Sequence, residues 1–299
     1  MTNTAYAITT RALTKHFGRL KALDDVCAHV PRGSIYGLMG PNGAGKTTFI
    51  RCFLNLIEPT SGTAAVLGHD VVRESVAVRR RVGHVAALQP LWDWMTVREF
   101  ARFARGCYPC WNQQTVCDIL SRVGINENAR IQVLSRGQRA LVSLAVAIGH
   151  EPDLLLLDEA LTGLDPIARR EVLRNVIEAM HADGRTVLIA GQDIADMERI
   201  CDHIGFLVSG RLVLESPLDD LKARVKRVRV EHPAESPPAV PADALLLEQS
   251  ARETLFTTRD CSPALLDSLN GPGRRVEAKG LSLEDIFVHL AQPPVEAIR

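Results

Sequence analysis

The most constraining feature of the sequence is a glycine-rich run, GPNGAGKTT, at residues 40–48. It fits the pattern Gly-x-x-x-x-Gly-Lys-Thr through Gly40, Gly45, Lys46 and Thr47. This pattern is typical of loops that bind the phosphates of nucleoside triphosphates. Such a loop follows a strand and opens a helix, so the run predicts an α/β fold.

Each residue type in this run suits phosphate chemistry. Glycines let the backbone turn its N–H groups inward around phosphate oxygens, in conformations that a side chain would forbid. Lys46 places a positive charge near the outer phosphates, and Thr47 offers a hydroxyl to a magnesium ion. The residues expected to contact ATP are Gly40, Pro41, Asn42, Gly43, Ala44, Gly45, Lys46, Thr47 and Thr48.

The sequence on either side of the run supports this interpretation. Residues 35–39 are largely apolar and predict a short buried strand, and residues 48–57 predict a helix that ends before Pro59. A helix that begins at the loop directs its positive end at a bound anion. The alternative, a glycine-rich turn without a ligand, is disfavoured by this strand, loop and helix.

Composition excludes several classes of protein. Lys and Arg number 35 and Asp and Glu number 35, so no net charge recruits a membrane surface or a nucleic acid. The longest apolar runs are too short to cross a bilayer, and the N-terminus does not look like a secretory signal, which predicts a cytoplasmic protein. Seven scattered cysteines, with no fourth ligand near Cys107, Cys110 and Cys117, predict reduced thiols without a metal.

The order of predicted elements indicates two domains. Strands and helices alternate from residue 1 to about 215, the pattern of a mainly parallel sheet. Helices alone are predicted in the middle of this region, so we expect an inserted helical subdomain at about 90–150. The first domain is expected at 1–216, and a small accessory α+β domain at 217–299.

A second motif supplies two carboxylates. The apolar run at 154–157 ends in Asp158 and Glu159, and a buried strand delivers these side chains to the edge of the sheet beside the phosphate loop. Asp158 is expected to hold magnesium through its water shell, and Glu159 to orient or deprotonate the attacking water. The alternative, in which both acids only cap the next turn, is disfavoured beside a phosphate loop.

A second anion-binding pattern, LSRGQ, lies at residues 134–138 before a predicted helix at 139–148. Ser135 and the backbone N–H of Gly137 form a second cradle for an anion at the helix start. One nucleotide does not need two such cradles. We therefore expect each cradle to serve a different copy, with two ATP molecules held between two facing subunits.

With these motifs in place, the sequence resembles the nucleotide-binding subunit of ATP-binding cassette (ABC) transporters over about residues 5–215. The family's dimer-crossing loop matches residues 161–165, and its adenine-stacking aromatic matches Phe17, for which a place in the core is the alternative. The positions that match the family's ATP contacts outside the phosphate loop are Phe17, Ser135, Gly137, Gln138 and Asp165. Residues 280–287 resemble the tail of the family's drug-export and bacteriocin-type branch.

The resemblance implies an ATPase of the P-loop class with a mainly parallel core sheet, an antiparallel β subdomain and an inserted helical subdomain. It implies ATP and Mg²⁺ as cofactors, with Thr47 and Asp158 as the metal ligands. A second nucleotide-binding subunit, identical or different, and a separate integral membrane permease are the implied partners. The chain is accordingly expected on the inner face of the cell membrane, held there through a permease that is an exporter.

Two positions depart from the family's pattern, and both touch the terminal phosphate. Ala87 stands where the family has a glutamine that senses magnesium and water, and Gln89 replaces it only if the loop shifts register. Gln192 stands where the family has a histidine that bonds the γ-phosphate. A glutamine amide donates a hydrogen bond but cannot shuttle a proton, so our hypothesis is that ATP hydrolysis is slow or depends on a partner. The alternative is that Gln192 is a conservative replacement and that turnover is near normal.

All three tryptophans fall in one short window with other aromatic residues. The members are Trp92, Trp94, Phe100, Phe103, Tyr108 and Trp111. Such a cluster suits either a groove that receives a helix of a membrane subunit or the core of the helical subdomain. Two other functions also stay open: a regulatory or immunity switch that scarcely hydrolyses ATP, and a soluble cassette ATPase that acts on ribosomes or DNA.

Overall fold

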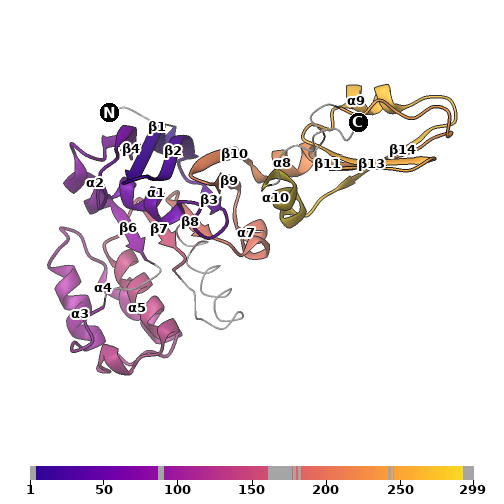
Figure 1. Cartoon of the computed structure of the whole chain (residues 1–299). Coiled ribbons are helices and arrows are strands. Elements are labelled where there is room, and N and C mark those ends of the chain that lie inside the picture. Colours follow the sequence, from indigo (N-terminus) through magenta and orange to yellow (C-terminus); the bar gives the residue numbers. More distant parts are fainter. Residues whose placement is uncertain are drawn as a thin grey trace. The chain divides into compact units, whose positions relative to one another are not determined.

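The computed structural model describes residues 5–86, 91–160, 177, 180, 183–241, 244 and 246–291. The chain divides into two compact units, one of Met1–Asp196 with Ile200–Glu215 and one of Met197–Arg199 with Ser216–Arg299 (Figure 1). Within the described part, no helix has the length and apolar character needed to span a membrane.

The first unit contains a six-stranded sheet in the order β10-β9-β3-β8-β7-β6. Its strands are β3 (Ile35–Met39), β6 (Val82–Val85), β7 (Leu154–Asp158), β8 (Thr186–Gly191), β9 (His203–Val208) and β10 (Arg211–Pro217). Strand β3 pairs in parallel with β8 and β9, and β7 pairs in parallel with β6 and β8. Every residue of β7 and β8 is buried, as parallel strands covered on both faces require. The carboxyl ends of β3 and β7 therefore lie at the same edge of the sheet.

A second sheet of the same unit is antiparallel, in the order β2-β1-β4-β5. Its strands are β1 (Tyr6–Phe17), β2 (Leu20–Pro31), β4 (Ser61–Val66) and β5 (His69–Asp70). One core joins the two sheets, and helix α1 (Lys46–Phe53) contributes Phe49 and Phe53 to it. The helix that follows the glycine-rich run is thereby fixed to both sheets.

The first unit also contains helices. Besides α1, those among the described residues are α2 (Ser75–Arg81), α3 (Val97–Arg105), α4 (Gln113–Arg122), the short η1 (Ile131–Val133) and α5 (Arg136–Gly149). Helix α7 (Ile194–Ile200) is shared between the two units, because Met197–Arg199 belong to the second. The segment from α3 to α5 lies between β6 and β7 in the chain and has its own core around Val97, Val116, Leu120 and Val142. This is the expected inserted helical subdomain.

The extent predicted for the helix after the glycine-rich run was wrong. Helix α1 begins two residues earlier than predicted, at Lys46, and ends at Phe53 rather than before Pro59. Asn55 adopts a φ of 50°, in the left-handed region that ends a helix, and the N–H of Leu56 turns back to the carbonyl of Arg51. The apolar residues that follow α1 belong to this turn, so their helical appearance in the sequence is misleading.

The second unit is a four-stranded antiparallel sheet, in the order β12-β13-β11-β14, with helices. Its elements are α8 (Leu218–Arg224), β11 (Lys226–Glu231), β12 (Leu246–Gln249), β13 (Glu253–Thr258), α9 (Pro263–Leu269), β14 (Arg275–Gly280) and α10 (Leu283–Ala291). Strand β11 buries Val228 and Val230, and Phe256 and Leu269 complete the core. The fold is α/β with a mainly parallel core sheet, an antiparallel sheet, inserted helices and a small α+β unit, as predicted from the sequence.

Candidate nucleotide-binding site

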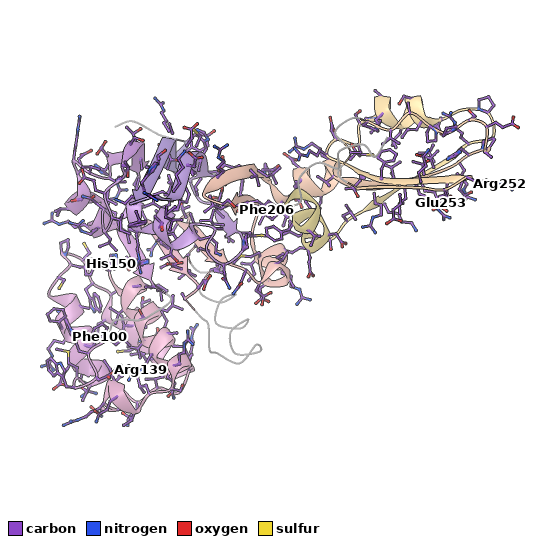
Figure 2. All side chains as sticks on the ribbon, viewed as in Figure 1. Phe100, Arg139, His150, Phe206, Arg252 and Glu253 are labelled. Carbon is purple, nitrogen blue, oxygen red and sulfur yellow. The ribbon has the colours of Figure 1, made fainter. Side chains whose placement is uncertain are left out.

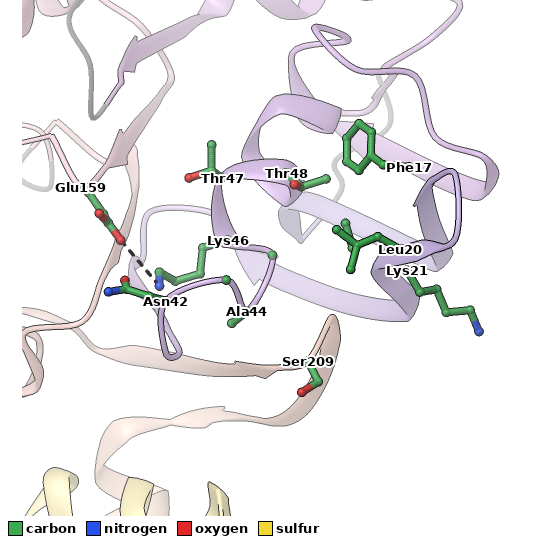
Figure 3. A pocket seen from close by; sticks show the side chains of 13 residues that line it. Phe17, Leu20, Lys21, Asn42, Ala44, Lys46, Thr47, Thr48, Glu159 and Ser209 are labelled. Carbon is green, nitrogen blue, oxygen red and sulfur yellow. Dashed lines mark ion pairs between the residues drawn. The ribbon is translucent and has the colours of Figure 1, made fainter.

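The glycine-rich run connects β3 to α1 and lines a pocket of about 480 Å³ (Figure 3). The end of β1 and the start of β2 line the same pocket. The residues around it are Phe17, Leu20, Lys21, Ala22, Asn42, Gly43, Ala44, Gly45, Lys46, Thr47, Thr48, Glu159 and Ser209. Its volume lies in the range of pockets that hold small-molecule ligands, whereas Gly40 and Pro41 lie outside its lining.

Glycine is required in this loop for two different reasons. Gly45 has a φ of 107°, and a Cβ there would also lie 2.5 Å from the carbonyl oxygen of Ala22. Gly40 does not have a positive φ, but a Cβ at this position would overlap the carbonyl oxygen of Leu207 on β9. The first glycine of the motif therefore serves close packing, and not the unusual backbone conformation that we expected for it.

Lys46 is buried at the start of α1 and points along the loop. Its Nζ donates hydrogen bonds to the carbonyl oxygens of Gly40 at 2.7 Å and Pro41 at 3.1 Å, and lies 3.7 Å from Oε1 of Glu159. Burial lowers the pKa of the Lys46 ammonium, and the Glu159 carboxylate opposes this shift. The geometry holds a positive charge inside the pocket, where an anion is the complementary ligand.

Thr47 and Asp158 form an oxygen pair beside the loop. The Thr47 hydroxyl donates to Oδ1 of Asp158 at 3.0 Å, and Asp158 is only 2% exposed at the end of β7. Burial raises the pKa of the Asp158 carboxyl, while the hydrogen bond from Thr47 lowers it. A hydroxyl next to a buried carboxylate fits the oxygen ligands that Mg²⁺ prefers, so these two residues suit the expected metal.

Glu159 follows β7 in a strained backbone conformation. Its φ is 48°, in the left-handed region, and its N–H donates to the carbonyl of Ala190 on β8 at 3.0 Å. A non-glycine residue in this region carries strain of about 1 kcal/mol or more, which the surrounding structure has to offset. The carboxylate points to Lys46 at the wall of the pocket (Figure 3). This position beside the loop lysine suits the water-orienting role predicted from the sequence.

Phe17 lies at the end of β1, lines the pocket and is 46% exposed as a residue. The core alternative for this residue is therefore wrong. An exposed ring over a phosphate loop suits the stacking of a nucleobase. Leu20, at the start of β2, lines the same pocket and is 66% exposed.

The LSRGQ pattern lies at the start of α5, and its residues do not line the pocket. Ser135 caps the helix: its Oγ accepts from the N–H of Gln138 at 3.2 Å, and Gln138 Oε1 accepts from the N–H of Ser135 at 3.0 Å. Gly137 is buried in the first turn. The two anion-binding patterns are thus separate sites on one chain.

The remaining predicted residues are placed as follows. Gln192 directly follows β8, is exposed, and does not line the pocket. Ala87, Gln89 and Asp165 lie outside the described residues. Ser209, in the turn after β9, lines the pocket although no sequence motif includes it. It reaches the pocket because β9 pairs with β3, a tertiary fact that the sequence does not display.

The six members of the aromatic cluster lie in different surroundings. Phe100 and Trp111 pack against the core of the helical subdomain, and Tyr108 stacks on His150 with ring centroids 4.0 Å apart. Trp92, Trp94 and Phe103 are exposed, with the Trp92 ring centroid 6.5 Å from that of Trp94 and 4.6 Å from that of Phe103. The core interpretation thus holds for Phe100 and Trp111, and Trp92, Trp94 and Phe103 form a surface that we name the aromatic patch.

The aromatic patch is tied directly to the start of α5. Asp93, between the two exposed tryptophans, forms an ion pair with Arg139 at 2.7 Å, and its carbonyl accepts from the N–H of Gln132 at 3.2 Å. Arg139 lies in the first turn of α5, and Figure 2 shows it within the helical subdomain. These two contacts link the segment that carries the aromatic patch to the residues around Ser135 and Gly137.

A phosphate loop between a parallel strand and a helix, with a threonine and aspartate pair and a glutamate beside its lysine, defines a P-loop ATPase. The sequence profile described as "ABC transporter" matches residues 23–162. The chain belongs to the ABC transporter family; it is an ATP-binding subunit and an ATPase.

Relatives of known description agree with this assignment. The daunorubicin resistance ATP-binding protein DrrA3 of Streptomyces coeruleorubidus is 33% identical over 98% of this chain and 94% of its own length. The bacitracin transport ATP-binding protein BcrA of Bacillus licheniformis is 33% identical over 74% of this chain and 72% of its own. Among solved structures, the ATP-binding subunit of an ABC transporter covers 73% of this chain and 92% of its own, with 27% identity and a TM-score of 0.67.

Proposed function

We propose that the chain is one of two nucleotide-binding subunits that close around two ATP molecules and thereby drive a separate integral membrane permease. One observation carries this proposal. The pocket around Lys46 contains no residue of the LSRGQ pattern, which lies at the start of α5 with Ser135 as the N-cap and Gly137 in the first turn. The phosphate loop and the LSRGQ pattern do not meet within one chain. If a second subunit faces the first, the loop of each subunit can meet the LSRGQ pattern of the other.

The roles of the pocket residues follow from their positions. Lys46 binds the outer phosphates, Thr47 and Asp158 hold Mg²⁺, and Glu159 orients the attacking water. Mg²⁺ neutralises charge that develops on the phosphate oxygens during transfer. Phe17 stacks on adenine, and Ser135, Gly137 and Gln138 with Asp165 contact the ATP that faces them from the second subunit.

Dimer formation is tested with the Glu159→Gln variant, which is designed to bind ATP without hydrolysing it. Light scattering with and without Mg-ATP should show a mass near twice that of one chain only when nucleotide is present. The same variant with Ser135→Ala added should stay monomeric, because it lacks the second half of the site. A dimer that forms without ATP, or that survives Ser135→Ala, would contradict the sandwich.

We further propose that hydrolysis is slow. Gln192 is neutral at every pH, and it follows β8, the strand that pairs with β7 beside the site. A protein that binds ATP and closes but turns over slowly also serves as a regulatory switch, which is the second candidate function. ATPase assays on the purified wild type and Gln192→His test the rate, and brisk wild-type turnover that the variant leaves unchanged would end this proposal.

The aromatic patch is the proposed docking surface for a helix of the permease. Trp94 is 66% exposed, and clustered exposed aromatic residues are frequent anchors of protein interfaces. Trp94→Ala should reduce co-purification with a membrane protein and leave the melting temperature unchanged. Trp111→Ala is the matched control, because Trp111 packs in the helical core and its loss should lower the melting temperature instead.

The direction of transport is proposed from relatives. Daunorubicin resistance and bacitracin transport are named for two of them, so we propose that the permease exports an antibiotic-like molecule. The chain would then lie on the inner face of the membrane, with a nucleotide-binding domain at 1–216 and an accessory domain at 217–299. Co-purification of a permease from membranes supports transport, and co-purification of ribosomes would contradict it.

A further inference from the structure

Phe17, at the wall of the pocket, makes a contact that no sequence motif explains. The ammonium Nζ of Lys15 lies over the ring of Phe17, 5.2 Å from its centroid. The same Nζ donates a hydrogen bond to the carbonyl oxygen of Glu58 at 2.7 Å. Lys15 is therefore held between the end of β1 and the segment before β4.

Lys15 reaches the ring from outside the pocket. Phe17 lines the pocket and Lys15 does not, while the Lys15 ammonium lies over the Phe17 ring. The pairing of β1 with β2 shifts register between Lys15 and His16, an irregularity of the kind that re-aims side chains at strand ends. Phe17 as a whole residue is 46% exposed, so part of its surface is available for stacking.

We propose that Lys15 is a positioning residue for the nucleobase. A cation over one face of an aromatic ring is attracted by the electrons of the ring. Because the carbonyl of Glu58 fixes this cation, the exposed Phe17 ring has one preferred position before ATP arrives. A ring that is already ordered loses less freedom when a base stacks on it, which strengthens binding of the base.

This inference rests on the proposed stacking of adenine on Phe17, and its prediction concerns the base alone. Triphosphate that lacks a base contacts the loop and Lys46 but not the ring. Removal of the Lys15 cation should therefore weaken the binding of ATP by about two- to five-fold, which is the size of a cation–π contact at an exposed site. The binding of inorganic triphosphate should be unchanged.

The experiment measures dissociation constants of ATP and inorganic triphosphate by calorimetry on the full chain. Lys15→Met should weaken the binding of ATP but not of inorganic triphosphate. Lys15→Arg, which keeps a cation, should retain the affinity for ATP. Lys21→Met is the charge control: Lys21 lies on the same hairpin and pairs with Asp24 at 2.6 Å, so its loss should affect ATP and triphosphate equally. An equal loss for both ligands in Lys15→Met would overturn the proposal, because it would show simple charge attraction.

A double-mutant comparison separates this inference from the function on which it rests. In a Phe17→Leu background, Lys15→Met should have no further effect on ATP, because the ring has gone. If Phe17→Leu weakens ATP but Lys15→Met does not, the role of Lys15 is overturned and the stacking site stands. If Phe17→Leu leaves the affinity for ATP unchanged, the stacking site and the role of Lys15 are overturned together.

Discussion

Two helices of the first unit begin with an anion-binding pattern, and they begin differently. The N-cap of helix α1 is Gly45, and no side chain caps the helix there. The N-cap of helix α5 is Ser135, and a capping box with Gln138 satisfies the N–H groups of these two residues. The first helix start leaves its donors for a ligand, whereas side chains satisfy part of the second.

The difference indicates what each site does alone. The loop before α1 encloses a buried Lys46 and lies next to Asp158, so a single chain holds most of what a triphosphate needs. At α5 the Ser135 oxygen accepts a hydrogen bond from the N–H of Gln138, and a serine hydroxyl is able to donate one as well. Under the proposed function, this hydroxyl would donate to the phosphate of the ATP on the facing subunit.

The largest expected effect is a loss of ATP turnover at the phosphate loop without a loss of ATP binding. Glu159→Gln keeps the shape of the side chain but removes the carboxylate, so turnover should fall by about 10²–10⁴-fold while ATP remains bound. Steady-state phosphate release and ATP titration measure the two quantities. Glu235→Gln, an exposed change in the second unit, should leave turnover unchanged. Near-normal turnover in Glu159→Gln would show that another group orients the water.

The second prediction contrasts the two helix starts directly. Lys46→Met should weaken ATP binding by about 10- to 100-fold, the range for loss of a hydrogen bond to a charged group. Ser135→Ala should leave the affinity of a single chain for ATP unchanged and reduce turnover, because under the proposed function Ser135 contacts only the ATP of the facing subunit. Equal loss of affinity in both variants would contradict the division into two half-sites.

The phosphate loop could be predicted from the sequence because phosphate binding restricts which residue types can occupy its positions. The strand at Ile35–Met39 and the position of the two acids at the end of β7 were predicted correctly, since parallel strands bring their carboxyl ends to one edge. Local sequence patterns suffice for such predictions when the structure of a segment depends on that element and its neighbour along the chain.

The parts that the sequence did not reveal depend on distant neighbours. Gly40 is needed because β9 passes behind it, and Ser209 lines the pocket for the same reason. The packing of α3 to α5 decides which aromatic residues of the cluster are buried. Residues of the same type are therefore found both in the core and on the surface. The length of α1 was wrong because a left-handed Asn55 overrides the apolar pattern.

The third prediction concerns the residue after β8. Gln192→His introduces a side chain that both donates a hydrogen bond and titrates near neutral pH, so turnover should rise by about 10-fold. The rise should be seen in phosphate release and should depend on pH, whereas wild-type turnover should lack that dependence. Gln192→Ala is the control that removes the amide without adding a titrating group. A rise in Gln192→Ala as well would show that the amide obstructs the site.

The smallest effect concerns the far end of the second helix. His150 follows α5, its ring centroid lies 4.0 Å from that of Tyr108, and burial lowers its pKa from 6.5 to about 4. Between these values the unfolded chain binds the proton and the folded chain does not, so stability is lost as pH falls. At pH 5.5 the loss should be about 1 kcal/mol, and His150→Phe, which keeps the stacked ring, should remove it. Urea titrations at about pH 7.5 and 5.5 measure the difference, and equal acid sensitivity in both proteins would exclude His150 as its source.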